Sequence, residues 1–95
     1  MKLQDKLVVV TGASQGIGRQ IALSCAAEGA DVVLAARSVD AMVSVAAEIE
    51  NSGRAAQVVE TDLTDRASVE ALGRAVLDRW NRVDVLVNNS GIGGP

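Results

Sequence analysis

Four short runs of apolar, largely β-branched residues constrain the fold of this chain more than any other feature. They cover residues 7–10, 32–36, 55–59 and 83–87. The runs lack the regular alternation of apolar and polar residues that marks a half-exposed strand. Nearly continuous apolar strands of this length are typical of parallel sheets that are covered on both faces. The pattern therefore predicts a set of buried parallel strands.

Segments with helical periodicity separate these runs. The first follows the helical period over residues 17–26 and stops at Gly29, and the second covers residues 41–50. Short polar residues that precede a helix supply side-chain oxygens for its free N–H groups. We therefore expect the second helix to begin near Ser38 or Asp40.

The third helical segment precedes the last apolar run. We expect Thr64 or Asp65 to cap its first turn and its apolar face to pack on the sheet. Strands and helices then alternate as β-α-β-α-β-α-β, which predicts a doubly wound α/β fold with parallel strands and right-handed crossovers. The apolar stripe of this third helix consists of Val69, Leu72, Val76 and Trp80.

The composition argues against several classes of function. The chain has no His and one Cys, so it offers neither a His-ligated metal site nor a disulfide. Cys25 lies among alanines and is expected to be a small packed residue. A net charge of −3 argues against nucleic acid as a partner. No apolar run approaches the ~20 residues of a membrane span, and no signal peptide is visible, so we expect a cytoplasmic protein without membrane contact.

A glycine-rich loop joins the first strand to the first helix. It reads Thr-Gly-Ala-Ser-Gln-Gly-Ile-Gly over residues 11–18, with the spacing G-x-x-x-G-x-G. The free N–H groups and the dipole of a helix N-terminus favour an anion such as a pyrophosphate. Gly12 would permit the sharp exit from the strand, Gly16 the close approach of the diphosphate, and Gly18 tight packing of the helix. The alternative is that these glycines only form the turn.

This loop resembles the cofactor loop of the short-chain dehydrogenases/reductases. The resemblance implies a Rossmann-like fold with the strand order 3-2-1-4 and a dinucleotide cofactor. It places Ser14, Gln15 and Ile17, together with the three glycines, against the pyrophosphate side of that cofactor. Residues 1–95 would form the N-terminal part of a single nucleotide-binding domain, without a second domain.

The end of the second strand bears on which cofactor is used. An acid at this place would hold a ribose 2′-hydroxyl, whereas an Arg accommodates a 2′-phosphate. The chain has Arg37 and Ser38 there and no Asp or Glu. In the resembling family such an Arg accompanies NADP(H), and Ser14 would add a second hydroxyl donor. Gln15 stands where many NADP(H)-dependent members carry a basic residue, so NADP(H) is the preferred cofactor and NAD(H) the alternative.

Polar residues also follow the third and fourth strands. The resemblance implies that Asp62 receives the adenine amino group and that Leu63 covers the ring. The alternative for Asp62 is a role in capping the next helix, although it lies early for that. Residues 88–91 read Asn-Asn-Ser-Gly, similar to the NNAG segment of the family. Asn89 would contact the cofactor ribose, Asn88 would connect strand ends, and Gly91 would admit the cofactor.

The family's reaction uses residues that this chain lacks. Its general acid is a Tyr, assisted by a Lys four residues later, a Ser and an Asn, all in the second half of the fold. The sequence contains no Tyr, so we assign no catalytic residue and expect the 95 residues alone to be inactive. In a full-length form we expect a small carbonyl or alcohol substrate and a homo-oligomer. A non-catalytic nucleotide-binding module and an inactive truncated product are the alternatives. Without further strands, the fourth strand would be an exposed edge.

Overall fold

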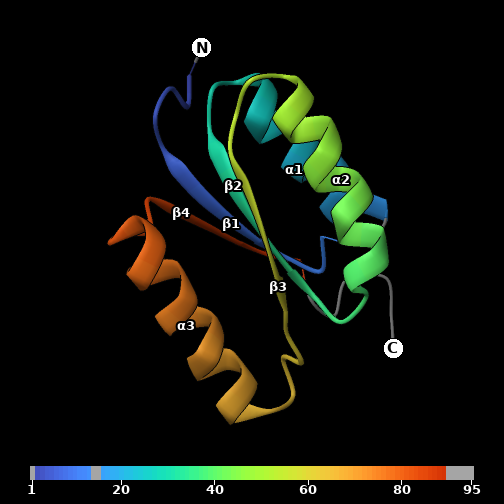
Figure 1. The fold of residues 1–95 in the computed structure, drawn as a ribbon, viewed down its shortest axis with the longest axis vertical. Helices are drawn as coiled ribbons and strands as arrows, with labels where there is room; N and C mark the ends of the chain where they lie inside the picture. Colours follow the sequence, from blue (N-terminus) through green and yellow to red (C-terminus); the bar gives the residue numbers. More distant parts are fainter. Residues whose placement is uncertain (1, 14–15, 90–95) are drawn as a thin grey trace.

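The computed structural model describes residues 2–13 and 16–89, which form a three-layered α/β structure. Figure 1 shows the sheet in the middle, with α1 and α2 on one side and α3 on the other. The elements, in chain order, are β1 (Leu7–Thr11), α1 (Gly16–Ala27), β2 (Asp31–Ala36), α2 (Val39–Asn51), β3 (Ala56–Glu60), α3 (Arg66–Trp80) and β4 (Val85–Asn88).

The four strands form one parallel sheet in the order β3-β2-β1-β4. In its register, Val9 of β1 lies between Val33 of β2 and Leu86 of β4. This arrangement confirms the predicted α/β class and the strand order 3-2-1-4. Because all strands are parallel, their carboxyl ends lie along one edge of the sheet.

Two apolar clusters hold the layers together. The cluster under α1 and α2 is the larger, and it takes alternate residues of the strands, such as Val10 and Leu34, with Met42 and Ile49 of α2. The cluster under α3 is smaller, and its fully or nearly buried members are Leu7, Val9, Val33, Ala35, Leu72 and Val76. β1 and β2 are thus buried on both faces, as their unbroken apolar runs predict, whereas β3 is mostly half-buried and β4 is mostly exposed.

α2 and α3 both follow an N-cap residue that the sequence predicted, but only α3 has the side-chain capping bond. Asp65 is the N-cap of α3, and its side chain accepts a hydrogen bond from the N–H of Ala67. Ser38 occupies the N-cap position of α2 but forms no side-chain capping bond. Trp80, the last residue of α3, packs against the smaller cluster as predicted, and its indole N–H donates to Gln57 of β3 at 2.8 Å.

The fourth strand is shorter and more exposed than the others. It begins at Val85, two residues later than its apolar run, because Asp84 turns its carboxylate toward the N–H of Leu7 at 2.7 Å. Its one neighbour among the described strands is β1. Leu86 is 62% exposed and Val83 is 47% exposed, so this edge is apolar and open among the described residues. Within residues 2–13 and 16–89, no helix is long and apolar enough to cross a membrane.

Candidate functional site

The candidate site lies at the carboxyl edge of the sheet, where the loops after the strands meet. The loop after β1 is tied to β2 by a hydrogen bond of 2.8 Å from the Gly12 N–H to the carbonyl oxygen of Ala35. The segment after β3 is tied to β2 in the same way, from the Thr61 N–H to the carbonyl oxygen of Ala36 at 2.8 Å. These bonds bring residues from distant parts of the sequence to one place, as in other α/β sheets that bind ligands at this edge.

Two of the three predicted glycines allow close packing within the loop after β1. Gly12 has a φ of +65°, a conformation that residues with a Cβ rarely adopt. A Cβ on Gly18 would collide with the carbonyl oxygen of Gly12 and lie 2.6 Å from Nδ2 of Asn89. Gly18 therefore lets the first turn of α1 pack against the ends of β1 and β4, as the sequence predicts.

Among the described residues, the N-terminus of α1 is open toward solvent. Gly16, its first residue, is exposed with a φ of +59°, and a Cβ built there meets no described atom within 4 Å apart from its chain neighbours and its own helix backbone. The first turn contains no acidic side chain, so none competes for its free N–H groups. Ile17 is 59% exposed beside it. An anion such as a pyrophosphate fits this terminus. Ser14, Gln15 and Gly91, which were predicted to help, lie outside the described residues.

Asn88 and Asn89 connect the end of β4 to the end of β1. The hydroxyl of Thr11 donates to Oδ1 of Asn88 at 3.1 Å and accepts from the N–H of Asn89 at 3.0 Å. Asn88 thus connects strand ends as expected. The sequence patterns did not indicate this role for Thr11. Thr11 is the polar last residue of an otherwise apolar strand and directly precedes Gly12. This position is the signal that could have indicated its role.

The side chain of Asn89 points into the glycine loop. Its Nδ2 donates to the carbonyl oxygen of Gly12 at 3.3 Å. Its Oδ1 is buried and has no hydrogen-bond partner among the described residues. Buried acceptors without a partner are uncommon in folded proteins, and a bound ion or ligand can complete them. Asn89 therefore stabilises the loop through one amide atom and offers the other as an acceptor.

Arg37 and Asp62 form the second part of the site. Arg37 follows β2, Asp62 follows β3, and Nη2 of Arg37 donates to Oδ1 of Asp62 at 3.1 Å. The side chain of Arg37 is 71% exposed, so most of its guanidinium faces solvent. Ser38 is exposed beside it, and its hydroxyl makes no capping bond.

The loop around Asp62 fixes its carboxylate. Oδ1 accepts from the N–H of Thr64 at 2.9 Å and from the Thr64 hydroxyl at 2.6 Å. The N–H of Asp62 donates to the hydroxyl of Ser68 at 2.8 Å. The hydrogen bonds from Thr64, and to a smaller extent Arg37, hold the pKa of the Asp62 carboxyl below its usual value. Asp62 therefore caps the turn before α3, and Leu63 lies half-buried next to it.

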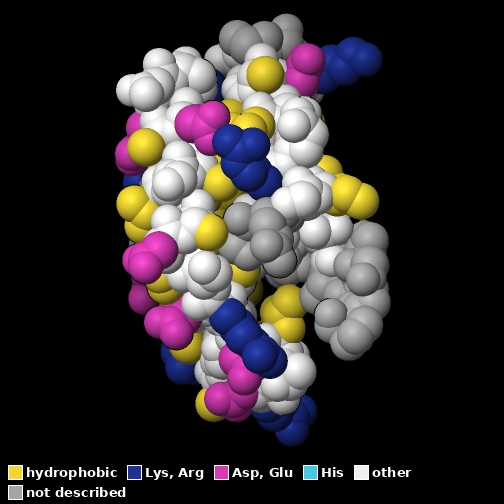
Figure 2. Space-filling view, turned by 90° about the vertical axis from the view of Figure 1, so that its right-hand side faces the viewer, with side chains coloured by type: hydrophobic (Ala, Val, Ile, Leu, Met, Phe, Trp, Pro, Cys, Tyr) yellow, Lys and Arg dark blue, Asp and Glu magenta, His cyan; other side chains and the backbone are white. Residues whose placement is uncertain are grey.

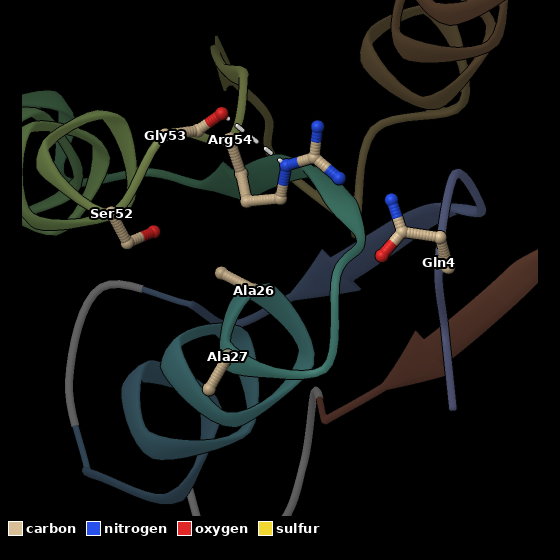
Figure 3. Close-up of a pocket in the computed structure, with 6 residues that line it drawn as sticks. All are labelled: Gln4, Ala26, Ala27, Ser52, Gly53 and Arg54. Carbon is tan, nitrogen blue, oxygen red and sulfur yellow. Dashed lines mark hydrogen bonds between the residues drawn. The ribbon is translucent and has the colours of Figure 1, made fainter. Parts of the chain in front are cut away.

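A hollow of about 350 Å³ lies at the opposite edge of the sheet, away from these residues. Figure 3 shows residues that line it, which come from the ends of α1 and α2, with the Arg54 side chain extending toward the side where Gln4 lies. Arg54 donates to the carbonyl oxygens of Gly29 at 2.7 Å and Gly53 at 3.3 Å. These bonds tie loops at the amino edge together, and no residue that lines the hollow belongs to the candidate site.

The remaining described residues do not indicate a second site. Within the described part of the chain, no three His, Cys, Asp or Glu residues gather as a metal site would require. Cys25 is half-buried against the larger core cluster, and burial raises the pKa of its thiol, which favours the packing role expected for it. Figure 2 shows the side on which α1 and α2 lie, where acidic, basic and apolar side chains are interspersed.

Comparison with known proteins identifies the family. Residues 6–95 match the family described as short chain dehydrogenase. The 1,6-dihydroxycyclohexa-2,4-diene-1-carboxylate dehydrogenase of Acinetobacter baylyi is 46% identical over 90 residues, which is 95% of this chain and 34% of that protein. The crystal structure of hydroxysteroid dehydrogenase from Escherichia coli matches with a TM-score of 0.92 at 38% identity, covering 99% of this chain and 40% of that one.

A third match bears on the ligand. The crystal structure of a metagenomic short-chain oxidoreductase in complex with NADP has a TM-score of 0.91 at 42% identity and covers 100% of this chain and 44% of that one. The chain thus spans only 34% to 44% of the length of these three proteins. The family match, the parallel sheet in the order β3-β2-β1-β4 and the glycine loop lead to one conclusion: the chain belongs to the short-chain dehydrogenase family of oxidoreductases.

Proposed function

We propose that residues 1–95 are the cofactor-binding, N-terminal part of an oxidoreductase that prefers NADP(H) over NAD(H). The observation that carries the preference is Arg37, which lies exposed at the end of β2 beside Ser38. A guanidinium can bind a 2′-phosphate through paired, charge-assisted hydrogen bonds. An acid that would hold a 2′-hydroxyl is absent from residues 35–38.

The proposed arrangement follows the edge of the sheet. Residues 12–18 bind the pyrophosphate at the N-terminus of α1, with Gly91 close to the cofactor. Arg37, Ser38 and Ser14 bind the 2′-phosphate. Asp62 and Leu63 hold the adenine, and Asn89 contacts the ribose. The open N-terminus of α1 and the unpartnered Oδ1 of Asn89 support this arrangement.

In the whole protein, a bound nicotinamide dinucleotide would supply hydride-transfer chemistry toward a small carbonyl or alcohol substrate. The residues of this chain bind and orient the adenosine and pyrophosphate parts of the cofactor. The accompanying proton needs a donor, which in the family is a Tyr, and the 95 residues contain no Tyr. We therefore assign the proton donor to another part of the full-length protein, which we propose is a cytoplasmic homo-oligomer.

Removal of Arg37 tests the cofactor preference. We expect the chain to bind NADPH more tightly than NADH, and Arg37→Ala to weaken NADPH binding about tenfold while NADH binding changes little. Nicotinamide fluorescence gives both dissociation constants. Arg79→Ala, which removes the same charge from the last turn of α3, is the matched control and is expected to leave the preference unchanged.

Two results would contradict this proposal. One is NADH binding as tightly as NADPH, or more tightly. The other is an unchanged preference after Arg37→Ala, which would mean that the guanidinium does not contact the 2′-phosphate.

A further inference from the structure

We propose that Asp62 determines how strongly this site prefers a 2′-phosphate, because its carboxylate pairs with the guanidinium that would bind the phosphate. This inference rests on the function proposed above and deepens it. It assigns to Asp62 a role in specificity that is separate from any contact with the adenine.

The pairing follows from the order of the strands. β2 and β3 are adjacent and parallel, and Ala36 lies opposite Glu60 in their register. The loops after them therefore leave the sheet side by side, one with Arg37 and the other with Asp62. The two side chains meet at 3.1 Å between Nη2 and Oδ1.

Asp62 is held in place by its own loop and does not need Arg37 for its position. Thr64 donates two hydrogen bonds to Oδ1, and Ser68 accepts the Asp62 N–H. The negative charge is therefore fixed at this point even when Arg37 turns toward a ligand. Among the described residues these bonds to the carboxylate all use Oδ1, so Oδ2 is left for a donor such as the adenine amino group.

A phosphate on Arg37 is affected by this fixed charge through the guanidinium. The phosphate must compete with the carboxylate for Arg37, and salt screens this competition. Both side chains are well exposed, at 71% for Arg37 and 43% for Asp62, so water weakens the competition as well. For exposed charges at this separation we expect an effect of about two- to fivefold on affinity.

Two adenosine ligands isolate this effect in the full 95-residue chain. Adenosine 2′,5′-bisphosphate and adenosine 5′-monophosphate differ only in the 2′-phosphate. The ratio of the dissociation constant of the monophosphate to that of the bisphosphate therefore measures the preference for the 2′-phosphate, and the contribution of the adenine cancels. Asp62→Asn removes the charge and keeps an acceptor for Thr64. We expect this substitution to increase the preference for the bisphosphate about two- to fivefold at low salt, and less at high salt.

Two further variants serve as controls. Asp65→Asn removes a charge from the same loop, where Asp65 caps α3, and should change the ratio less. Asp62→Asn combined with Arg37→Ala should give the ratio of Arg37→Ala alone, because the effect passes through the guanidinium. Asp62→Ser, which also keeps a local acceptor, replaces Asp62→Asn if that variant does not fold.

The outcomes separate this inference from the proposed function. If Arg37→Ala lowers the ratio but Asp62→Asn leaves it unchanged or lowers it, the inference is wrong and the proposed preference stands. If the effect of Asp62→Asn persists without Arg37, pairing is not its cause and the inference also fails. If neither adenosine ligand binds, or Arg37→Ala leaves the ratio unchanged, the proposed function fails and the inference fails with it.

Discussion

β2 and β4 flank the same strand, β1, yet they differ sharply in how much of their surface they bury. All residues of β2 from Val32 to Ala36 are buried. In β4, Val85 is 37% exposed and Leu86 is 62% exposed. Both strands are apolar and both pair with β1 in parallel register. The difference therefore does not come from strand composition or from hydrogen bonding to β1.

The neighbours of each strand explain the difference. β2 lies between β1 and β3, with the larger apolar cluster on one face and the α3 cluster on the other. β4 has β1 on one side and no described strand on the other. An apolar edge strand of this kind is a template for pairing with another chain. Among the described residues, the β2 side of β1 is thus a closed core, whereas the β4 side is an open surface.

Truncation of one leucine on each side of β1 should give the largest contrast. Leu34 of β2 is fully buried, so Leu34→Ala should lower the free energy of unfolding by about 2–5 kcal/mol. Leu86→Ala should lower it by less than about 1 kcal/mol, because most of the Leu86 side chain already contacts water. Urea denaturation of both variants measures the two values. Equal decreases in the free energy of unfolding for the two variants would show that the β4 edge is covered in solution. The two sides of β1 would then not differ in burial.

A smaller effect is expected where α1 joins the two sides of β1. A Cβ at Gly18 would press on Gly12 at the end of β1 and on Asn89 beyond the end of β4. Gly18→Ala should therefore lower the free energy of unfolding by about 1–3 kcal/mol. Gly73→Ala is the matched control, since a Cβ at that position in α3 meets no described atom within 4 Å apart from its chain neighbours and its own helix backbone. It should raise stability by about 0.5–1 kcal/mol, because Ala favours a helix.

The same denaturation experiment separates the two glycines. A stable Gly18→Ala variant would mean that α1 shifts without loss of packing, and that the two strand ends are less tightly joined than their contacts indicate.

The sequence predicted the elements well because periodicity is a local property. Apolar runs and helical spacing identified all seven elements, and Asp65 was one of the two expected caps of α3. The start of β4 was wrong by two residues. Asp84 follows Val83 in an apolar run. Its side chain accepts a hydrogen bond from the N–H of Leu7, which is distant in sequence, so the sequence did not indicate that β4 begins only after Asp84.

Contacts within the candidate site were harder to predict, because they join residues that are distant in sequence. Arg37 and Asp62 were each singled out, but their ion pair depends on the adjacency of β2 and β3 and on two side-chain conformations. The role of Thr11 likewise depends on the register between β1 and β4. The assignment of individual residues to the adenine, ribose and phosphates stays a prediction.

The smallest expected effect concerns the attachment of β4 to β1. The Asp84 carboxylate accepts hydrogen bonds from the Leu7 N–H at 2.7 Å and from Nε of Arg82 at 2.8 Å. The bond from Leu7, followed by that from Arg82, holds the pKa of Asp84 below its usual value. A carboxyl whose pKa is lower in the folded state stabilises the fold above its unfolded pKa of about 3.9. That contribution is lost as the pH falls through the lower, folded value.

Comparison with Asp84→Asn isolates this contribution, since Asn keeps an acceptor but not the charge. At neutral pH we expect the urea midpoint of the variant to lie below that of the unsubstituted chain. The gap should close as the pH falls through the folded pKa of Asp84, because the unsubstituted carboxyl is then neutral as well. Asp78→Asn, on the exposed surface of α3, is the control and should shift the neutral-pH midpoint less. A gap that widens in acid would reverse the sign of the argument. Equal urea midpoints at neutral pH would mean that the backbone hydrogen bonds between β1 and β4 are sufficient to hold β4. The attachment of this exposed strand would then not depend on the Asp84 carboxylate.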